Sequence, residues 1–134
     1  MEITLTNEPA ERKRLHGALE EFARENKISG KALQAADLAL EEHLTNVFTH
    51  GLGKCETAVA VVRLAMDETW LKIEVEDEGK AFNPLEQPKV DTTKPLDEKE
   101  IGGLGIHLMR QFMDQLDYRR SGGRNLLTMR KRLD

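Results

Sequence analysis

The sequence has few of the features that mark secreted, membrane or nucleic-acid-binding proteins. Only one of its 134 residues, Cys55, is a cysteine, which excludes an internal disulfide framework and is typical of a reducing compartment. No apolar run approaches the roughly 20 residues of a membrane-spanning helix, and the N-terminal residues lack the basic and hydrophobic segments of a secretory signal. The net charge of -4 does not favour nucleic acid or an anionic membrane. We therefore expect a cytoplasmic protein without direct contact to nucleic acid or membrane.

The composition is that of a single globular domain. Hydrophobic residues make up 39% of the chain and charged residues 33%, and no internal repeat or low-complexity segment interrupts them. A chain of this length suits one domain with a real core. Residues 1–134 are therefore expected to form one domain.

The hydrophobic pattern predicts an alternation of helices and strands. Asn7 and Pro9 are typical of a helix start, with Asn7 as the cap and Pro9 in the first turn. Gly122-Gly123 between two short strand-like segments is a hairpin signal. Along the chain we expect a short edge strand at 3–5, helices at about 9–25 and 31–48, strands at 57–66 and 70–77, a helix at about 106–116, and a hairpin of 117–121 with 125–133.

The second predicted helix has two unlike faces. Leu40, Leu44 and Val47 share an apolar stripe, whereas Glu42 and Asn46 lie one turn apart on a polar row. His50, four residues further on, would extend that row. Such rows usually form a solvated face, so the row by itself does not establish a site.

Asp77 ends the most regular strand pattern of the chain. From residue 70 to 77 apolar and charged residues alternate, and the period of two places Asp77 on the apolar side. A carboxylate that points inward is costly unless something bonds to it. This position therefore calls for a specific partner.

Glycine-bearing turns follow the strand. Gly79 lies in the turn after Asp77, and residues 83–101 then form a charged loop with three prolines and no usable periodicity, which indicates a functional lid or a disordered segment. Gly102-Gly-Leu-Gly105 precedes a predicted helix, where exposed backbone amides suit phosphates. It is neither a Walker loop nor part of a dinucleotide-binding unit.

The order of these motifs is more specific than any one of them. Glu42-x-x-x-Asn46 on a helix, Asp77-x-Gly79-x-Ala81-Phe82 after a strand, a long lid and Gly103-x-Gly105 before a helix resemble the ATP-binding domain shared by gyrase, histidine kinases and mismatch-repair ATPases. Within it the chain looks most like the anti-sigma factor serine-protein kinases of bacterial partner-switching systems. The resemblance implies the Bergerat fold: a two-layer α/β sandwich with a mixed, mostly antiparallel sheet and helices on one face.

The resemblance also implies roles for the helix row and the strand end. In that family the asparagine of the helix motif binds Mg²⁺, here Asn46, and the glutamate four residues earlier acts as general base, here Glu42. An amide oxygen is a suitable hard ligand for Mg²⁺, and a carboxylate held close can take a proton from an attacking hydroxyl. His50 matches a position near the phosphates. Asp77 matches the residue that accepts the adenine amino group, which accounts for its inward direction.

Further nucleotide-binding residues follow from the same resemblance. Ala81 replaces the commoner glycine, and Asn125 stands where relatives often carry threonine. The lid is expected at about 83–103. The implied contacts to the base and the phosphates are Gly79, Ala81, Phe82, Gly102, Gly103, Leu104, Gly105, Ile106 and Asn125.

By this resemblance the protein is an ATP-binding anti-sigma factor with serine/threonine kinase activity. It would use ATP and Mg²⁺ to phosphorylate a small anti-anti-sigma (antagonist) protein, and it would sequester a sigma factor. Because such proteins commonly dimerise, a second copy of the chain is a further expected partner. One alternative is a nucleotide-gated regulator that holds partners without phosphorylating them. Another is a detached histidine-kinase catalytic domain, which the lack of a long dimerisation helix with an acceptor histidine disfavours.

Overall fold

The computed structural model describes residues 1–51, 59–86 and 109–133, with only the backbone for His50 and Gly51. Residues 109–112 are helical. The other elements are β1 (Glu2–Leu5), α1 (Pro9–Glu25), α2 (Gly30–Asn46), a π-helical turn (Val47–Gly51), β2 (Ala60–Met66), β3 (Trp70–Asp77), a 3₁₀ turn (Pro84–Glu86), β4 (Gln115–Ser121) and β5 (Arg124–Arg132).

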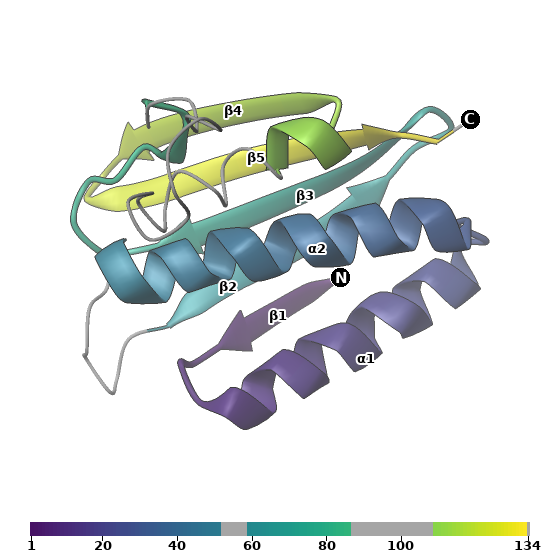
Figure 1. The fold of residues 1–134 in the computed structure, drawn as a ribbon, viewed down its shortest axis with the longest axis horizontal. Helices are drawn as coiled ribbons and strands as arrows, with labels where there is room; N and C mark the ends of the chain where they lie inside the picture. The colour runs from purple at the N-terminus through teal and green to yellow at the C-terminus, as the bar shows by residue number, and fades with distance from the viewer. Residues whose placement is uncertain (52–58, 87–108, 134) are drawn as a thin grey trace, which may run out of the picture.

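The strands form one five-stranded sheet in the order β1-β2-β3-β5-β4, and all four pairings are antiparallel. Helices α1 and α2 lie side by side over one face of this sheet (Figure 1). The predicted α/β sandwich with helices on one face is confirmed. No helix within the described ranges is long and apolar enough to cross a membrane.

The core lies between the two helices and the inward face of the sheet. Leu71, Ile73 and Val75 of β3 are buried there, as the alternation predicts, and Leu40 and Leu44 of α2 have no exposed surface. Burial of each such side chain contributes roughly 1.5–3 kcal/mol relative to exposure. The alternate residues of β3 are only half-buried on the other face. Packing therefore fixes both the rotation of α2 and the register of β3.

The start of α1 differs from the prediction. The N-cap is Glu8, not Asn7, and its side chain makes no capping hydrogen bond, while Pro9 occupies the first turn as expected. Glu11 instead reaches back and accepts a hydrogen bond from the backbone N–H of Thr6 at 3.2 Å. A side-chain hydrogen bond from Arg14, followed by this backbone bond, lowers the pKa of Glu11 to about 2. The predicted Asn7 cap is therefore wrong, and the first-turn carboxylate of Glu11 holds the chain that leads into the helix.

The helix predicted up to Leu116 ends earlier. Its described part stops at Phe112, and β4 already begins at Gln115. The backbone N–H of Asp114 donates to the carbonyl of Arg130 at 2.9 Å, and Leu116 pairs with Met129 of β5. Sheet pairing with β5 therefore overrides the helical spacing of these apolar residues.

The predicted hairpin is confirmed, and its turn explains the two glycines. Gly122 and Gly123 have φ values of +59° and +75°. Positive φ at both central residues is the requirement of a type I′ turn, whose twist matches that of the flanking strands. This turn sets the pairing of β4 with β5.

The turn conformation leads to a stability test. We expect Gly123→Ala to lower the free energy of unfolding by about 1 kcal/mol, because an alanine in the left-handed region is strained although nothing lies within 4 Å of the added Cβ. The matched control is Gly17→Ala in α1, where space is equally free; there alanine should stabilise the helix by roughly 0.5–1 kcal/mol. Urea denaturation measures both. Equal effects at the two positions would contradict a turn that requires positive φ.

Candidate functional site

Asp77 lies at the end of β3 with its carboxylate inside the protein, and only 4% of its surface is exposed. Its Oδ1 accepts a hydrogen bond from the backbone N–H of Gly79 at 2.9 Å. The same oxygen accepts from the side-chain amide of Asn125 at 3.0 Å. The inward carboxylate that the alternation predicts is therefore present and held in place.

Asn125 organises the turn that follows Asp77. It pairs with Asp77 in the β3–β5 register and is itself 5% exposed. Its Nδ2 donates to the carbonyl of Lys80 at 2.9 Å as well as to Asp77, and its Oδ1 accepts from the backbone N–H of Phe82 at 3.4 Å. These contacts are all with protein groups. In this structure Asn125 positions the turn of Asp77 to Phe82.

Strand β4 contributes two side chains that the sequence analysis missed. The hydroxyl of Tyr118 donates to Asn125 Oδ1, and Arg120 donates to the carbonyl of Gly79 at 2.6 Å. Arg120 pairs with Asn125 across the hairpin. Counting residues back from the two-glycine turn would have placed Arg120 opposite Asn125, so the sequence held a signal for this contact. Gly79 is buried, whereas Ala81 is exposed.

The C-terminal end of α2 supplies the second wall of the site. Asn46, the last residue of α2, is 3% exposed, and its Nδ2 is buried without a hydrogen-bond partner among the described residues. Glu42 lies one turn earlier and is half-buried. The backbone then widens into the π-helical turn of Val47–Gly51, a form that is frequent at functional sites. Glu42 and Asn46, the two side chains of the predicted polar row that the structure describes, are thus set into the protein rather than on a fully solvated face.

His43 is a further polar residue of α2 that turns inward. Its side chain is 4% exposed, its Nδ1 has no hydrogen-bond partner among the described residues, and burial lowers its pKa to about 4. The ring is therefore neutral near pH 7. His16, by contrast, is exposed on α1 and contacts Asp37 of α2 at 3.0 Å and Glu20 at 2.7 Å.

A small cavity lies where these elements meet. Its volume is about 10 Å³, close to that of one water-sized sphere. It is smaller than a purine ring, so a bound base would have to widen it. The lining residues are His43, Val47, Asp77, Phe82, Tyr118, Asn125 and Leu127.

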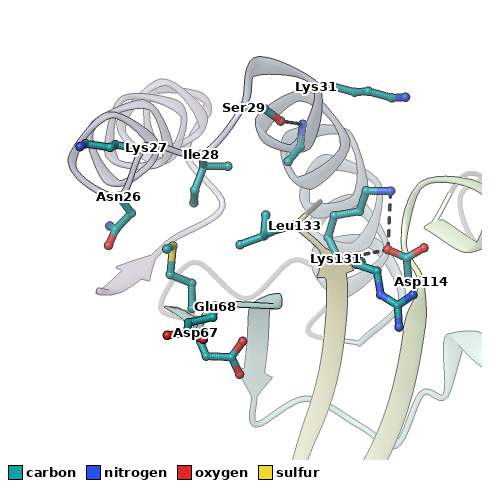
Figure 2. A pocket seen from close by; sticks show the side chains of 13 residues that line it. Asn26, Lys27, Ile28, Ser29, Lys31, Asp67, Glu68, Asp114, Lys131 and Leu133 are labelled. Atoms are coloured by element: carbon teal, nitrogen blue, oxygen red, sulfur yellow. Dashed lines mark hydrogen bonds and ion pairs between the residues drawn. The ribbon is translucent and has the colours of Figure 1, made fainter.

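A larger cavity, about 580 Å³, lies at the opposite end of the sheet, where Trp70 pairs with Arg132 (Figure 2). The connection between α1 and α2 forms one side, including Lys27 and Ile28. On the other side Asp114 pairs with Lys131 at 3.6 Å. None of the predicted site residues lines this cavity.

The remaining predicted residues are not placed by the structure. Gly102, Gly103, Leu104, Gly105 and Ile106 lie outside the described residues, as do Cys55 and most of the predicted lid at 83–103. For His50 only the backbone is described, within the π-helical turn. The structure brings together Asp77, Gly79, Phe82 and Asn125 with the C-terminal part of α2.

These features define an α/β domain with a small buried polar site between the end of α2 and the turn after β3. The chain belongs to the histidine kinase-like ATPase domain family, whose model matches residues 5–131. The predicted superfamily is thereby confirmed.

Individual relatives agree with this assignment. The chain is 29% identical over 111 residues to the serine/threonine-protein kinase BtrW of Bordetella bronchiseptica, covering 83% of this chain and 78% of that protein. It is 31% identical over 99 residues to an anti-sigma F factor of Clostridium perfringens, covering 72% and 69%.

Solved structures show the same fold. The structure of the RsbU and RsbW domains of a Mycobacterium tuberculosis protein superimposes with a TM-score of 0.65 at 17% identity, over 99% of this chain and 32% of that one. A blue-light activated histidine kinase of Erythrobacter litoralis has a TM-score of 0.54 at 19% identity, over 79% of this chain and 32% of that one.

The Asn125 contacts predict a cost for their removal. Asn125→Ala takes away the side-chain donor to the buried Asp77 carboxylate, and a hydrogen bond to a charged group is worth about 1.5–3 kcal/mol. We expect the free energy of unfolding to fall by about that amount in urea denaturation. Arg119→Ala, an exposed change on β4, is the control and should stay within about 0.5 kcal/mol of wild type. A fully stable Asn125→Ala protein would show that Asp77 does not depend on this amide.

Proposed function

We propose that this protein is an ATP-dependent serine/threonine kinase of the partner-switching type, which phosphorylates a small antagonist protein and sequesters a sigma factor. The observation that carries the proposal is the carboxylate of Asp77, which is buried and accepts two hydrogen bonds. Membership in the ATPase family and the names of two relatives, a serine/threonine-protein kinase and an anti-sigma F factor, support it.

The residues around Asp77 fit the base of ATP. A carboxylate fixed at the end of a strand is an acceptor for the amino group of adenine. Gly79 and Asn125 already hold this carboxylate in place, so it loses little conformational freedom when the base binds. The apolar Val47 and Leu127 line the same cavity and suit the faces of a purine. In this proposal Phe82 and Ala81 complete the base site, and Asn125 acts by positioning the turn.

The residues of α2 fit a phosphate-bound Mg²⁺. Within the described ranges no cluster of three or more His, Cys, Asp or Glu side chains could hold a metal. Mg²⁺ bound together with nucleotide phosphates needs only one or two protein oxygens. The carboxamide of Asn46, buried and with its nitrogen unpartnered, is suited to offer its oxygen. We assign His50 and the segment Gly102–Ile106 to the phosphates by the order of the motifs.

Glu42 is proposed as the general base. It lies one turn from Asn46 on α2, half-buried, so its carboxylate can be held near an incoming serine hydroxyl and take its proton. ATP, when bound, supplies the γ-phosphoryl group. Because phosphoryl transfer depends mainly on positioning and charge stabilisation, Glu42 and Asn46 need only fixed places on a rigid helix. A homodimer and a cytoplasmic location also belong to this proposal.

Replacement of Asp77 tests the nucleotide site. Asp77→Asn keeps the shape but removes the charged acceptor, so the affinity for ATP should fall about tenfold or more. Asp67→Asn is a matched control: Asp67 likewise accepts two hydrogen bonds, here from the backbone N–H groups of Thr69 and Trp70, but at the far end of β3. Its ATP affinity should equal that of wild type. Calorimetric titration measures both, and unchanged affinity in Asp77→Asn would remove Asp77 from the site.

Replacement of Glu42 tests the kinase reaction. Glu42→Gln should leave the free energy of ATP binding within about 1 kcal/mol of the wild-type value. It should reduce the rate of phosphoryl transfer to an antagonist protein by a factor of roughly 10²–10⁴, the usual contribution of a positioned base. Asn46→Ala should lower both binding and transfer, because it removes a metal ligand. The control is Glu41→Gln, which affects only the ion pair with Arg12.

Labelled ATP, Mg²⁺ and candidate antagonists from the same genome provide the assay, with phosphoserine as the product. ATP binding and partner binding without any transfer in wild type would favour the nucleotide-gated regulator instead. Full transfer in Glu42→Gln would place the base elsewhere.

A further inference from the structure

The buried imidazole of His43 is not used by the proposed kinase mechanism. It projects from α2 into the same small cavity that Asp77 lines, and it is 4% exposed. Its Nδ1 is one of three buried side-chain nitrogens without a partner within the described part of the chain, the others being Arg12 NH1 and Asn46 Nδ2. A buried polar atom without a partner is unfavourable and needs an explanation.

The other residues of the cavity suggest a partner for this nitrogen. Near pH 7 the ring is neutral, because burial lowers the pKa of His43 to about 4, so it carries one N–H donor and one acceptor. Asp77 lines the same cavity, and its carboxylate is an acceptor. The residues that line the cavity therefore include both an acceptor and a donor for a ligand that enters it.

We infer that His43 is a specificity-determining residue that donates from Nδ1 to ring nitrogen N1 of the adenine base, directly or through the single water that the cavity can hold. This inference rests on the proposed function. The edge of adenine presents a 6-amino donor next to the N1 acceptor, which complements Asp77 and His43. Guanine presents the reverse pattern, a carbonyl oxygen next to an N1–H donor, so both groups would oppose it.

The physical reason for discrimination is the burial of both groups. A site built to hydrogen-bond its ligand rejects a ligand that leaves buried polar groups unpaired far more strongly than it rejects a ligand of different size. Asp77 alone can accept from the N–H groups of either purine. The donor beside it is what would make the site selective for adenine.

The test compares ATP with 1-deaza-ATP, in which a C–H group replaces N1 and the 6-amino group is kept. Calorimetric titration of the full chain with Mg²⁺ should show roughly tenfold weaker binding of 1-deaza-ATP, as expected for loss of one buried hydrogen bond. In His43→Leu, which keeps an apolar side chain in the core, the ratio should fall to about one. In His43→Asn, whose amide lies near the Nδ1 position, part of the discrimination should return.

Two controls separate this inference from the proposed function. Asp77→Asn should weaken the binding of ATP and of 1-deaza-ATP by the same factor, and so leave the ratio of their affinities unchanged. 7-Deaza-ATP is altered on the other side of the base. Its affinity relative to ATP should therefore be the same in wild type and in His43→Leu. If wild type binds neither nucleotide, the proposed function itself fails.

The inference is overturned if wild type binds ATP and 1-deaza-ATP equally, a result that requires no variant to fold. It is also overturned if His43→Leu retains the wild-type ratio. In either case ATP binding and the role of Asp77 would stand.

Discussion

The satisfied carboxylate of Asp77 is the interaction on which the site depends. An inward carboxylate at a strand end is tolerated only if donors meet it, and here the Gly79 N–H and the Asn125 amide do so. Asn125 can reach because it pairs with Asp77 in the β3–β5 register. A register shift of one residue would move Asn125 to the opposite face of the sheet. The pairing of two strands thus sets the geometry around Asp77.

Helix α2 combines packing and chemistry along one element. Its apolar stripe, with Leu40 and Leu44 fully buried, fixes the rotation of the helix against the sheet. That rotation in turn directs His43 toward the Asp77 cavity and sets Asn46 into the protein. The π-helical turn that follows changes the helical spacing just where the polar row reaches His50. The site needs no separate scaffold, because the core positions it.

Much of this arrangement was predictable from local patterns. The alternation in β3 predicted both the buried face of the strand and the inward direction of Asp77. The two glycines predicted the β4–β5 turn. Local patterns failed where long-range contacts compete with them. Residues 115 and 116 look helical, yet pairing with β5 draws them into β4. Asn7 looks like a cap, yet α1 begins without a side-chain cap. Glu11 in its first turn instead accepts a hydrogen bond from the backbone N–H of Thr6.

Residue types and their spacing were enough to establish the family, the order of the elements and the inward position of Asp77, because these signals act along the chain. The groups that surround this carboxylate, in contrast, come together only when the chain folds. Tyr118, Arg120 and Asn125 come from a hairpin more than 40 residues away in the chain, and His43 comes from a helix that precedes the strand. Their meeting depends on strand register and helix rotation, which follow from packing of the whole core rather than from any one segment.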